Sequence, residues 1–185
     1  MKAGRIVADF LLIIPFMVVL STAFVVDKSL ANGIISGKYF WFYAAMVLAS
    51  IAVLLAVIIH KQNLHFFLLD GLIVIFCGCG LGITYYHTGE ITTKWVLLLL
   101  LLILYFYFRI FFVQNRWNLP VLMLFLVLTG LVEAIWGLRQ LYGFSFSQHN
   151  LFKTTGSFFN SGPYAGYLAV VFPLSLYYWI TGAQH

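Results

Sequence analysis

Six long runs of apolar residues, separated by shorter polar segments, account for most of the chain. Each run approaches or exceeds the length of about 20 residues that a helix needs to cross a bilayer. The runs occupy Ile6–Val26, Tyr39–Ile59, Phe66–Tyr86, Trp95–Val113, Leu119–Tyr142 and Pro163–Ile180. Stretches such as Val96–Leu104 are apolar on every face, whereas the strands of a membrane barrel alternate apolar and polar residues. The pattern predicts an all-α, polytopic membrane protein of about six transmembrane helices.

The connectors between these runs are polar, and one of them stands out by its length. The first four are Asp27–Lys38, His60–His65, His87–Lys94 and Gln114–Asn118, and the long one is Gly143–Gly162. We therefore divide the chain into a five-helix transmembrane region (1–142), an extracytoplasmic loop (143–162), and a sixth transmembrane helix with the C-terminal end (163–185).

Composition supports the membrane class. Of the 185 residues, 63% are hydrophobic and 8% are charged, and the formal net charge is +5. A soluble domain has about 45–50% apolar and about 25% charged residues. This chain has too few charged residues to cover a water-facing surface, and its basic excess is too sparse to follow a nucleic-acid backbone. The composition excludes a soluble enzyme and a nucleic-acid partner, and it makes the lipid bilayer the expected surroundings.

The first run resembles a secretory signal, because it follows a basic start. However, Asp9 interrupts it and Phe24–Val26 extend it past the candidate cleavage site, so we expect an uncleaved helix. Five Lys or Arg residues lie near the helix ends on each side of the membrane, so this count does not indicate which side carries the N-terminus. Lys2 and Arg5 precede the first helix and favour a cytoplasmic N-terminus, which places Gly143–Gly162 outside the cytoplasm.

Charged residues inside the predicted spans need a physical reason, because an isolated charge is costly in a bilayer. Asp9 lies four residues after Arg5, a spacing that favours an ion pair. Arg109 lies near a helix end and can extend to the headgroups, and Asp70 lies about one turn into its helix and can reach the interface. We expect structural roles for these charged groups.

Glu133 lies deeper in the membrane, in the fifth run. At about 100° per residue, Glu133, Gly137 and Gln140 share one helix face. A polar stripe that includes a glycine predicts a face turned toward protein or a wet cavity. Two interpretations of Glu133 are equally good. Either its carboxylate has a function, or it is a buried group that is hydrogen-bonded to a neighbouring helix. Arg139 adjoins the long loop, and we expect it to be functional.

Small residues on one helix face allow another helix to approach closely. In the third run they are Gly71, Gly78, Gly80 and Gly82, and in the sixth run they are Gly162, Gly166 and Val170, with Ala165 and Ala169. We expect the first set to serve packing or local flexibility, and the second set to be a packing face.

The most specific pattern lies in Thr155–Ala169, which has the sequence TGSFFNSGPYAGYLA. Asn160 or Ser161 is suited to cap the following helix, and Pro163 to stand in its first turn. The free backbone N–H groups of such a helix start attract anions, and Lys153 lies just upstream. The glycine spacing does not match a Walker loop, and a plain re-entry turn explains the glycines about as well.

The string TGSFFNSGPYAGYLAVVFPL resembles a pattern of the O-antigen ligase/polymerase superfamily, G-[ST]-F-x-N-x-x-x-x-A-x-[YL]-L with a later proline. The matching positions are Gly156, Ser157, Phe158, Asn160, Ala165, Tyr167, Leu168 and Pro173. The preceding segment Glu133–Gly143 resembles the helix that leads into that motif. The resemblance covers roughly the last third of the chain, and the first four helices match only in hydropathy.

The resemblance implies a metal-independent glycan ligase or polymerase of the bacterial inner (cytoplasmic) membrane, acting in lipopolysaccharide or polysaccharide biosynthesis. Such enzymes need no cofactor and transfer a sugar chain from a polyprenyl diphosphate carrier to an acceptor hydroxyl, with inversion at the anomeric carbon. Cations stabilise the leaving diphosphate, and a histidine activates the acceptor. The substrate-binding residues expected here are Glu133, Arg139, Lys153, Gly156, Ser157, Asn160 and Gly162. No catalytic residue is assigned.

The chain departs from the family in two respects. Family members often carry an arginine just before the motif glycine, where the nearest cation here is Lys153. Their acceptor-activating histidine lies in a loop well beyond the motif, and neither His149 nor His185 matches it. We therefore expect an N-terminal half that packs against a missing C-terminal half and is inactive alone. Half of a multi-pass transporter or flippase, and a non-catalytic membrane subunit, are the alternative functions.

Overall fold

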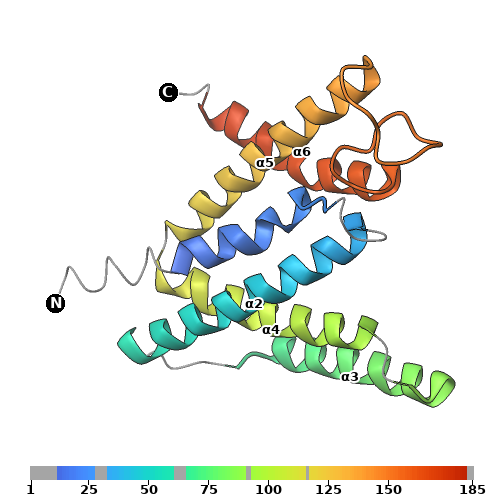
Figure 1. Ribbon diagram of the computed structural model, residues 1–185. Helices are drawn as coiled ribbons and strands as arrows, with labels where there is room; N and C mark the ends of the chain where they lie inside the picture. The colour runs from blue at the N-terminus through green and yellow to red at the C-terminus, as the bar shows by residue number, and fades with distance from the viewer. Residues whose placement is uncertain (1–11, 28–32, 61–65, 91–92, 116, 183–185) are drawn as a thin grey trace.

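The computed structural model describes residues 12–27, 33–60, 66–90, 93–115 and 117–182, and every regular element within these ranges is a helix. An N-terminal helix covers Leu12–Phe24, and its last turn is the 3-10 helix η1 (Ser21–Phe24). The longer helices are α2 (Gly33–His60), α3 (Leu68–Thr88), α4 (Thr93–Gln114), α5 (Asn118–Leu141) and α6 (Ser161–Gly182). Consecutive helices reverse direction, so the chain crosses the molecule repeatedly (Figure 1). The all-α prediction is confirmed.

Five of the described helices are long and apolar enough to cross a membrane. The shortest candidate spans, Leu68–Thr88 and Thr93–Val113, have 21 residues each. At about 1.5 Å per residue, 21 residues extend about 31 Å, which matches a hydrocarbon core of about 30 Å. The N-terminal helix covers the described part of the predicted first span, while Arg5 and Asp9 lie outside the described residues. The helices are those of a multi-pass membrane protein.

The apolar core lies where the N-terminal helix packs against α2 and α4. Phe16, Met46, Ala49 and Phe111 are all buried there. The rings of Phe16 and Phe111 are tilted against each other with centroids 4.5 Å apart. The small side chain of Ala49 leaves room on α2 for a close neighbour. This packing places the end of the N-terminal helix, including Ala23, beside the start of α2.

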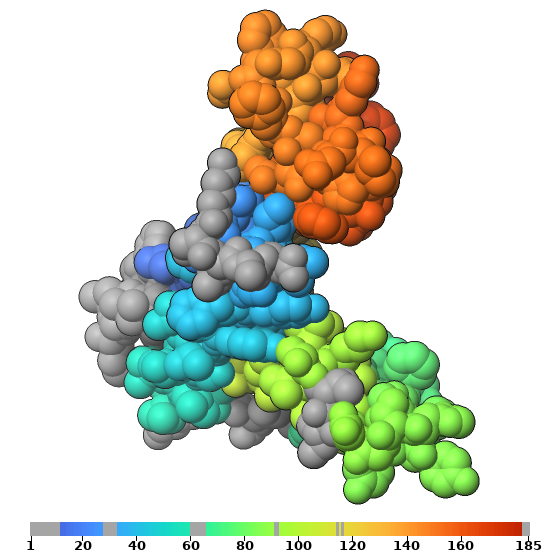
Figure 2. All heavy atoms as spheres, turned by 45° about the vertical axis from the view of Figure 1, so that its right-hand side comes forward, coloured from blue at the N-terminus to red at the C-terminus, as the bar shows by residue number. Residues whose placement is uncertain are grey.

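Outside this core, most apolar side chains are exposed, as expected for a surface that faces lipid. Figure 2 shows the part from α5 to α6, in orange and red, as a lobe beside the blue-to-green helices. The candidate spans of α6 and α3 are the least buried, with 6% and 11% of their residues buried. A Cβ added at Gly71, Gly78, Gly80 or Gly82 meets no heavy atom within 4 Å. Of the two roles expected for these glycines, helix packing is therefore wrong among the described residues, and local flexibility stays a prediction.

A buried charge pair joins α3 to α4. Asp70, which is 1% exposed, accepts hydrogen bonds from the Phe67 backbone N–H at 2.7 Å and the Tyr105 hydroxyl at 2.8 Å. It also forms an ion pair with Arg109, whose guanidinium lies over the Phe67 ring. The sequence predicts that these two charges reach the interface separately, whereas the structure pairs them. Pairing avoids the large cost of either charge alone in the membrane.

Helices α5 and α6 pack closely because glycines on α5 leave gaps that large side chains of α6 fill. A Cβ at Gly130 would overlap Val171, and a Cβ at Gly137 would overlap the Tyr164 ring. By contrast, a Cβ at Gly166 meets nothing within 4 Å. The expected small-residue packing face on α6 is therefore a wrong prediction within the described residues, because the small residues of this contact are those of α5.

Residues 142–160 connect α5 to α6 and are called the motif loop below. The loop turns back at Gly143, whose φ is +79°, and the backbone N–H groups of Phe144 and Ser145 donate to the Arg139 carbonyl. At its other end, Oδ1 of Asn160 accepts the backbone N–H of Gly162 at 3.1 Å. Asn160 therefore caps α6, as the sequence predicts.

Candidate functional site

The polar face predicted on α5 exists and is buried. Glu133 is 0% exposed and Gln140 is 5% exposed, and Gly137 between them is also buried. All three face the motif loop or α6 rather than the lipid. The periodicity of α5 was therefore sufficient to identify one side of the candidate site.

Gln140 holds the start of the motif through both ends of its side-chain amide. Its Oε1 accepts the backbone N–H groups of Thr155 and Gly156, each at 2.8 Å. Its Nε2 donates to the carbonyl oxygens of Gly156 at 3.0 Å and Phe146 at 3.1 Å. These four bonds use the full hydrogen-bonding capacity of the amide, so one side chain fixes the path of the buried loop backbone.

Glu133 binds the next residue of the motif. The backbone N–H of Ser157 donates to Oε2 of Glu133 at 3.0 Å, and the Ser157 hydroxyl donates to Oε1 at 2.5 Å. The same hydroxyl lies 2.5 Å from the carbonyl oxygen of Ala23. Glu133 and Ser157 are both fully buried. This cluster joins α5, the motif loop and the end of the N-terminal helix.

Gly156 is required by geometry at the centre of this arrangement. Its φ is +55°, in the left-handed region that favours glycine. A Cβ at this position would also overlap the Glu133 carboxylate and the Tyr164 ring. A glycine in the motif therefore lets the loop backbone approach α5 and α6 closely enough for the contacts of Glu133 and Gln140.

The rest of the motif loop is held by its own side chains. Oγ1 of Thr155, which is fully buried, accepts the backbone N–H of Gln148 at 3.1 Å. Nδ1 of His149 accepts the backbone N–H of Leu151 at 3.0 Å, and its ring packs on Phe152 and Phe159. These contacts give His149 a structural role in the loop. His185 lies outside the described residues.

Lys38 is the cation that the structure brings to the motif. It donates hydrogen bonds to the carbonyl oxygens of Ala23 and Thr22, and its ammonium lies 5.0 Å from the centroid of the Phe158 ring. Glu133 lies near enough to attract it electrostatically. The sequence places Lys38 in a connector, whereas α2 begins at Gly33 and carries it on the helix.

A cavity of about 480 Å³ lies between this lysine and the motif. Its lining includes Thr22, Ile35, Lys38, Leu101, Phe158 and Asn160. Four separate parts of the chain contribute: the N-terminal helix, α2, α4 and the motif region. The cavity is mostly apolar, with the ammonium group at one wall.

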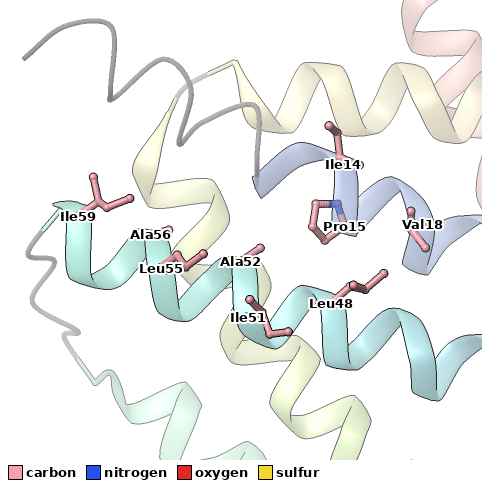
Figure 3. Close-up of a pocket in the computed structure, with 9 residues that line it drawn as sticks. All are labelled: Ile14, Pro15, Val18, Leu48, Ile51, Ala52, Leu55, Ala56 and Ile59. Carbon is pink, nitrogen blue, oxygen red and sulfur yellow. The ribbon is translucent and has the colours of Figure 1, made fainter.

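A second hollow, of about 280 Å³, lies between the N-terminal helix and α2 (Figure 3). Its nine lining residues are all apolar, among them Pro15, Val18 and Leu55. With no polar group in this lining, the hollow offers nothing to orient a reacting molecule, and we do not place chemistry there.

The other predicted site residues lie apart from the Glu133 cluster. Arg139 is exposed and lines a shallow hollow with Trp136 and Ser145, and Lys153 is exposed on the motif loop. Gly162 has open space around it, with the nearest atom to an added Cβ 3.9 Å away. Glu133 and Lys38 thus lie close to the motif, which contains Gly156, Ser157 and Asn160. The two predicted cations, Arg139 and Lys153, lie away from this group.

Comparison of the chain with protein-family models, with curated protein sequences and with solved structures finds no match. Within the described residues, no group of three or more His, Cys, Asp or Glu side chains is placed to hold a metal ion. The chemical capacity of the site therefore rests on hydrogen-bond donors, one ammonium group and an apolar cavity.

Proposed function

We propose that the chain is part of a glycan ligase or polymerase of the bacterial inner membrane. It transfers a sugar chain from a polyprenyl diphosphate carrier to an acceptor hydroxyl, at the extracytoplasmic side where the motif loop lies. The single observation that carries the proposal is the position of the motif. Its glycine and serine are fixed on α5, and Phe158 and Asn160 beside them line the cavity with Lys38.

The buried carboxylate supports this proposal. Ionisable groups within membrane helices are costly, and they are most often found where function requires them. Glu133 contacts the backbone and hydroxyl of Ser157, so it is a positioning residue that holds the motif in place. Phe158 and Asn160 of the motif line the cavity, where we expect the lipid-linked substrate to bind.

The chemistry is a displacement at the anomeric carbon of the donor sugar. The acceptor oxygen forms a bond to this carbon as the bond to the diphosphate oxygen breaks, and the diphosphate leaves with both bonding electrons. The acceptor proton passes to a base, which we assign to none of the described residues. Lys38 is placed to stabilise the leaving diphosphate, and Arg139 and Lys153 remain proposed contacts to the exposed part of the substrate.

The transporter alternative receives less support from the structure than from the sequence. Charged residues within helices favour a transporter, but here Asp70 and Arg109 pair with each other. Glu133 is likewise hydrogen-bonded to Ser157. Charges that are bonded to neighbouring protein groups provide no open polar path for a substrate. The open faces of α3 and α6 leave the non-catalytic subunit as an alternative that the following experiment tests.

The test is transfer of a fluorescent glycan from a polyprenyl diphosphate donor in proteoliposomes that contain the protein expressed from its natural gene. We expect a new glycosidic bond to the acceptor, with less product from Ser157→Ala, Arg139→Ala and Lys153→Ala. Cys79→Ala, an exposed change on α3, is the control and keeps wild-type transfer. Carrier movement across the bilayer without bond formation identifies a flippase. An inert chain that co-purifies with a stoichiometric partner identifies a subunit.

A further inference from the structure

The first half of the motif loop, residues 142–152, carries its large apolar side chains on the outside. The most exposed of them are Tyr142 at 72%, Phe144 at 75%, Leu151 at 83% and Phe146 at 96%. The small polar side chains between them are turned inward, because the Ser147 hydroxyl lies 3.2 Å from Oγ1 of Thr155 and Oγ of Ser145 is buried. A loop surrounded by water has the opposite arrangement, so this surface is suited to apolar surroundings.

Hydrogen bonds hold this half of the loop level with the last turn of α5. The backbone N–H groups of Phe144 and Ser145 donate to the Arg139 carbonyl at 2.8 and 3.2 Å. The Phe146 carbonyl accepts Nε2 of Gln140 at 3.1 Å. Both α5 residues lie within the last three positions of its candidate membrane span. The loop therefore turns back beside the span instead of extending away from it.

The second half of the loop lies deeper. Ser157 binds Glu133, which precedes the end of α5 by eight residues, or about 12 Å along the helix axis. Non-helical backbone is tolerated at membrane depth only where its polar groups have partners within the protein. Glu133 and Gln140 provide them for the N–H groups of Thr155, Gly156 and Ser157. The loop thus meets the hydrogen-bonding requirement for a segment that lies within a membrane.

The loop surface continues the lipid-facing flank of α5. A hollow of about 360 Å³ is lined by Ser145 of the loop and by Val132 and Ile135, which are exposed on α5. In a membrane these two side chains contact hydrocarbon, so the adjoining loop lies beside the same lipid. Figure 1 shows the loop, in orange, at the end of the molecule where α3 ends and α4 begins. The membrane surface reached by these helices is therefore also the one beside the loop.

The charge of the loop is complementary to that of anionic lipid headgroups. Residues 142–160 contain no Asp or Glu, and Lys153, which is exposed, is their one Lys or Arg. A surface that combines aromatic side chains with a cation is typical of protein segments that lie in the membrane interface.

We propose that residues 142–152 form a membrane anchor whose partner is the lipid leaflet beside the end of α5. The side chains of Tyr142, Phe144, Phe146 and Leu151 insert among the lipids. Lys153 extends to the headgroups and stays in contact with water. The anchor holds the motif loop at the level where Gln140 and Glu133 bind it. This inference does not depend on the proposed glycan transfer.

Spin labelling in nanodiscs that contain anionic phospholipid measures the depth of the anchor. The whole protein, with Cys77 and Cys79 replaced by alanine, receives one nitroxide label through Phe146→Cys or Leu151→Cys. Oxygen concentrates in hydrocarbon and a neutral nickel chelate stays in water, so the ratio of their collision rates with the label reports its depth. Both positions are exposed in the structure, so the label does not disturb the fold.

Two reference positions calibrate this ratio. Glu90→Cys places the label at an exposed position just after α3, on the same side of the molecule as the loop. Leu72→Cys places it on the open face of α3, which contacts lipid. We expect the oxygen-to-nickel ratio at Phe146→Cys and Leu151→Cys to exceed the Glu90→Cys value several-fold and to approach the Leu72→Cys value.

A further variant tests whether the aromatic rings hold the loop in the lipid. With the label at Leu151→Cys, the double change Phe144→Ser and Phe146→Ser lowers the oxygen-to-nickel ratio toward the value of Glu90→Cys. Phe76→Ser, a similarly exposed change on α3, is the matched control and leaves the ratio unchanged.

Three results would overturn the proposal. A ratio at both loop labels equal to that of Glu90→Cys places the loop in water. Slow collisions of both labels with oxygen and nickel alike identify a protein partner as the cover of this surface. An unchanged ratio in the double serine variant shows that the rings do not anchor the loop. Because glycan transfer is not measured, its absence contradicts the proposed function and leaves the anchor standing.

Discussion

The Ser157 hydroxyl donates to Oε1 of Glu133 at 2.5 Å, although 24 positions separate the two residues. The Ser157 backbone N–H donates to the other carboxylate oxygen at 3.0 Å. Glu133 therefore satisfies both the main chain and the side chain of the motif serine within a fully buried contact. The position of the motif depends on this carboxylate.

Removing the Glu133 carboxylate destabilises the protein. Glu133→Ala leaves the buried Ser157 N–H without its acceptor, at a cost of about 1–3 kcal/mol, while the Ser157 hydroxyl can still donate to the Ala23 carbonyl. Thermal unfolding in detergent measures the effect, and Glu90→Ala at an exposed position is the matched control. Equal melting temperatures for the two variants would contradict the role given to Glu133.

Gly156 and Gly166 differ in what an added methyl group meets. Gly156→Ala places a Cβ against Glu133 and Tyr164 at a left-handed φ, and we expect a loss of about 1–3 kcal/mol or more. Gly166→Ala adds a methyl group in open space within a helix and stabilises by up to about 1 kcal/mol. Denaturant unfolding of both variants distinguishes them, and a neutral Gly156→Ala would refute the close approach of loop and helix.

The Asp70–Arg109 pair couples α3 to α4. Arg109→Leu leaves the Asp70 carboxylate without its cation, and we expect a lower melting temperature. The Arg109 side chain is 24% exposed, so the loss is smaller than for a fully buried pair. The double variant Asp70→Leu with Arg109→Leu recovers part of the loss in a double-mutant cycle. Additive effects of the two changes would show that the pair is not coupled.

The side of the membrane that carries the motif loop is accessible to chemical labelling. In a variant with Cys77 and Cys79 replaced by alanine, Lys153→Cys provides a single exposed thiol on the loop. We expect a membrane-impermeant maleimide to label it in intact cells. Trp117→Cys, between α4 and α5, reacts only after permeabilisation. The reverse pattern would show that the N-terminus is outside.

Much of the fold could be predicted from local sequence, because the length of an apolar run and the angular spacing of residues on a helix are local properties. The five long helices, the shared face of Glu133 and Gln140, and the Asn160 cap were all predictable in this way. The contacts of the glycines could not be predicted in this way. A glycine in the sequence leaves space for a neighbouring side chain, but it does not show whether a side chain fills that space. Thus Gly130 is a packing residue and Gly78 is not.

The sequence by itself therefore determined the membrane class, the helices, and a buried polar stripe ahead of a glycine-containing motif. Only the tertiary structure decided which groups meet. It paired Asp70 with Arg109 and brought Lys38 to the motif, while Lys153 and Arg139 stayed exposed. The physical reason is that a buried charge is satisfied by whichever partner helix packing places beside it. Such a partner can lie anywhere along the chain, as the 16 and 39 positions spanned by the Lys38–Thr22 and Arg109–Asp70 bonds illustrate.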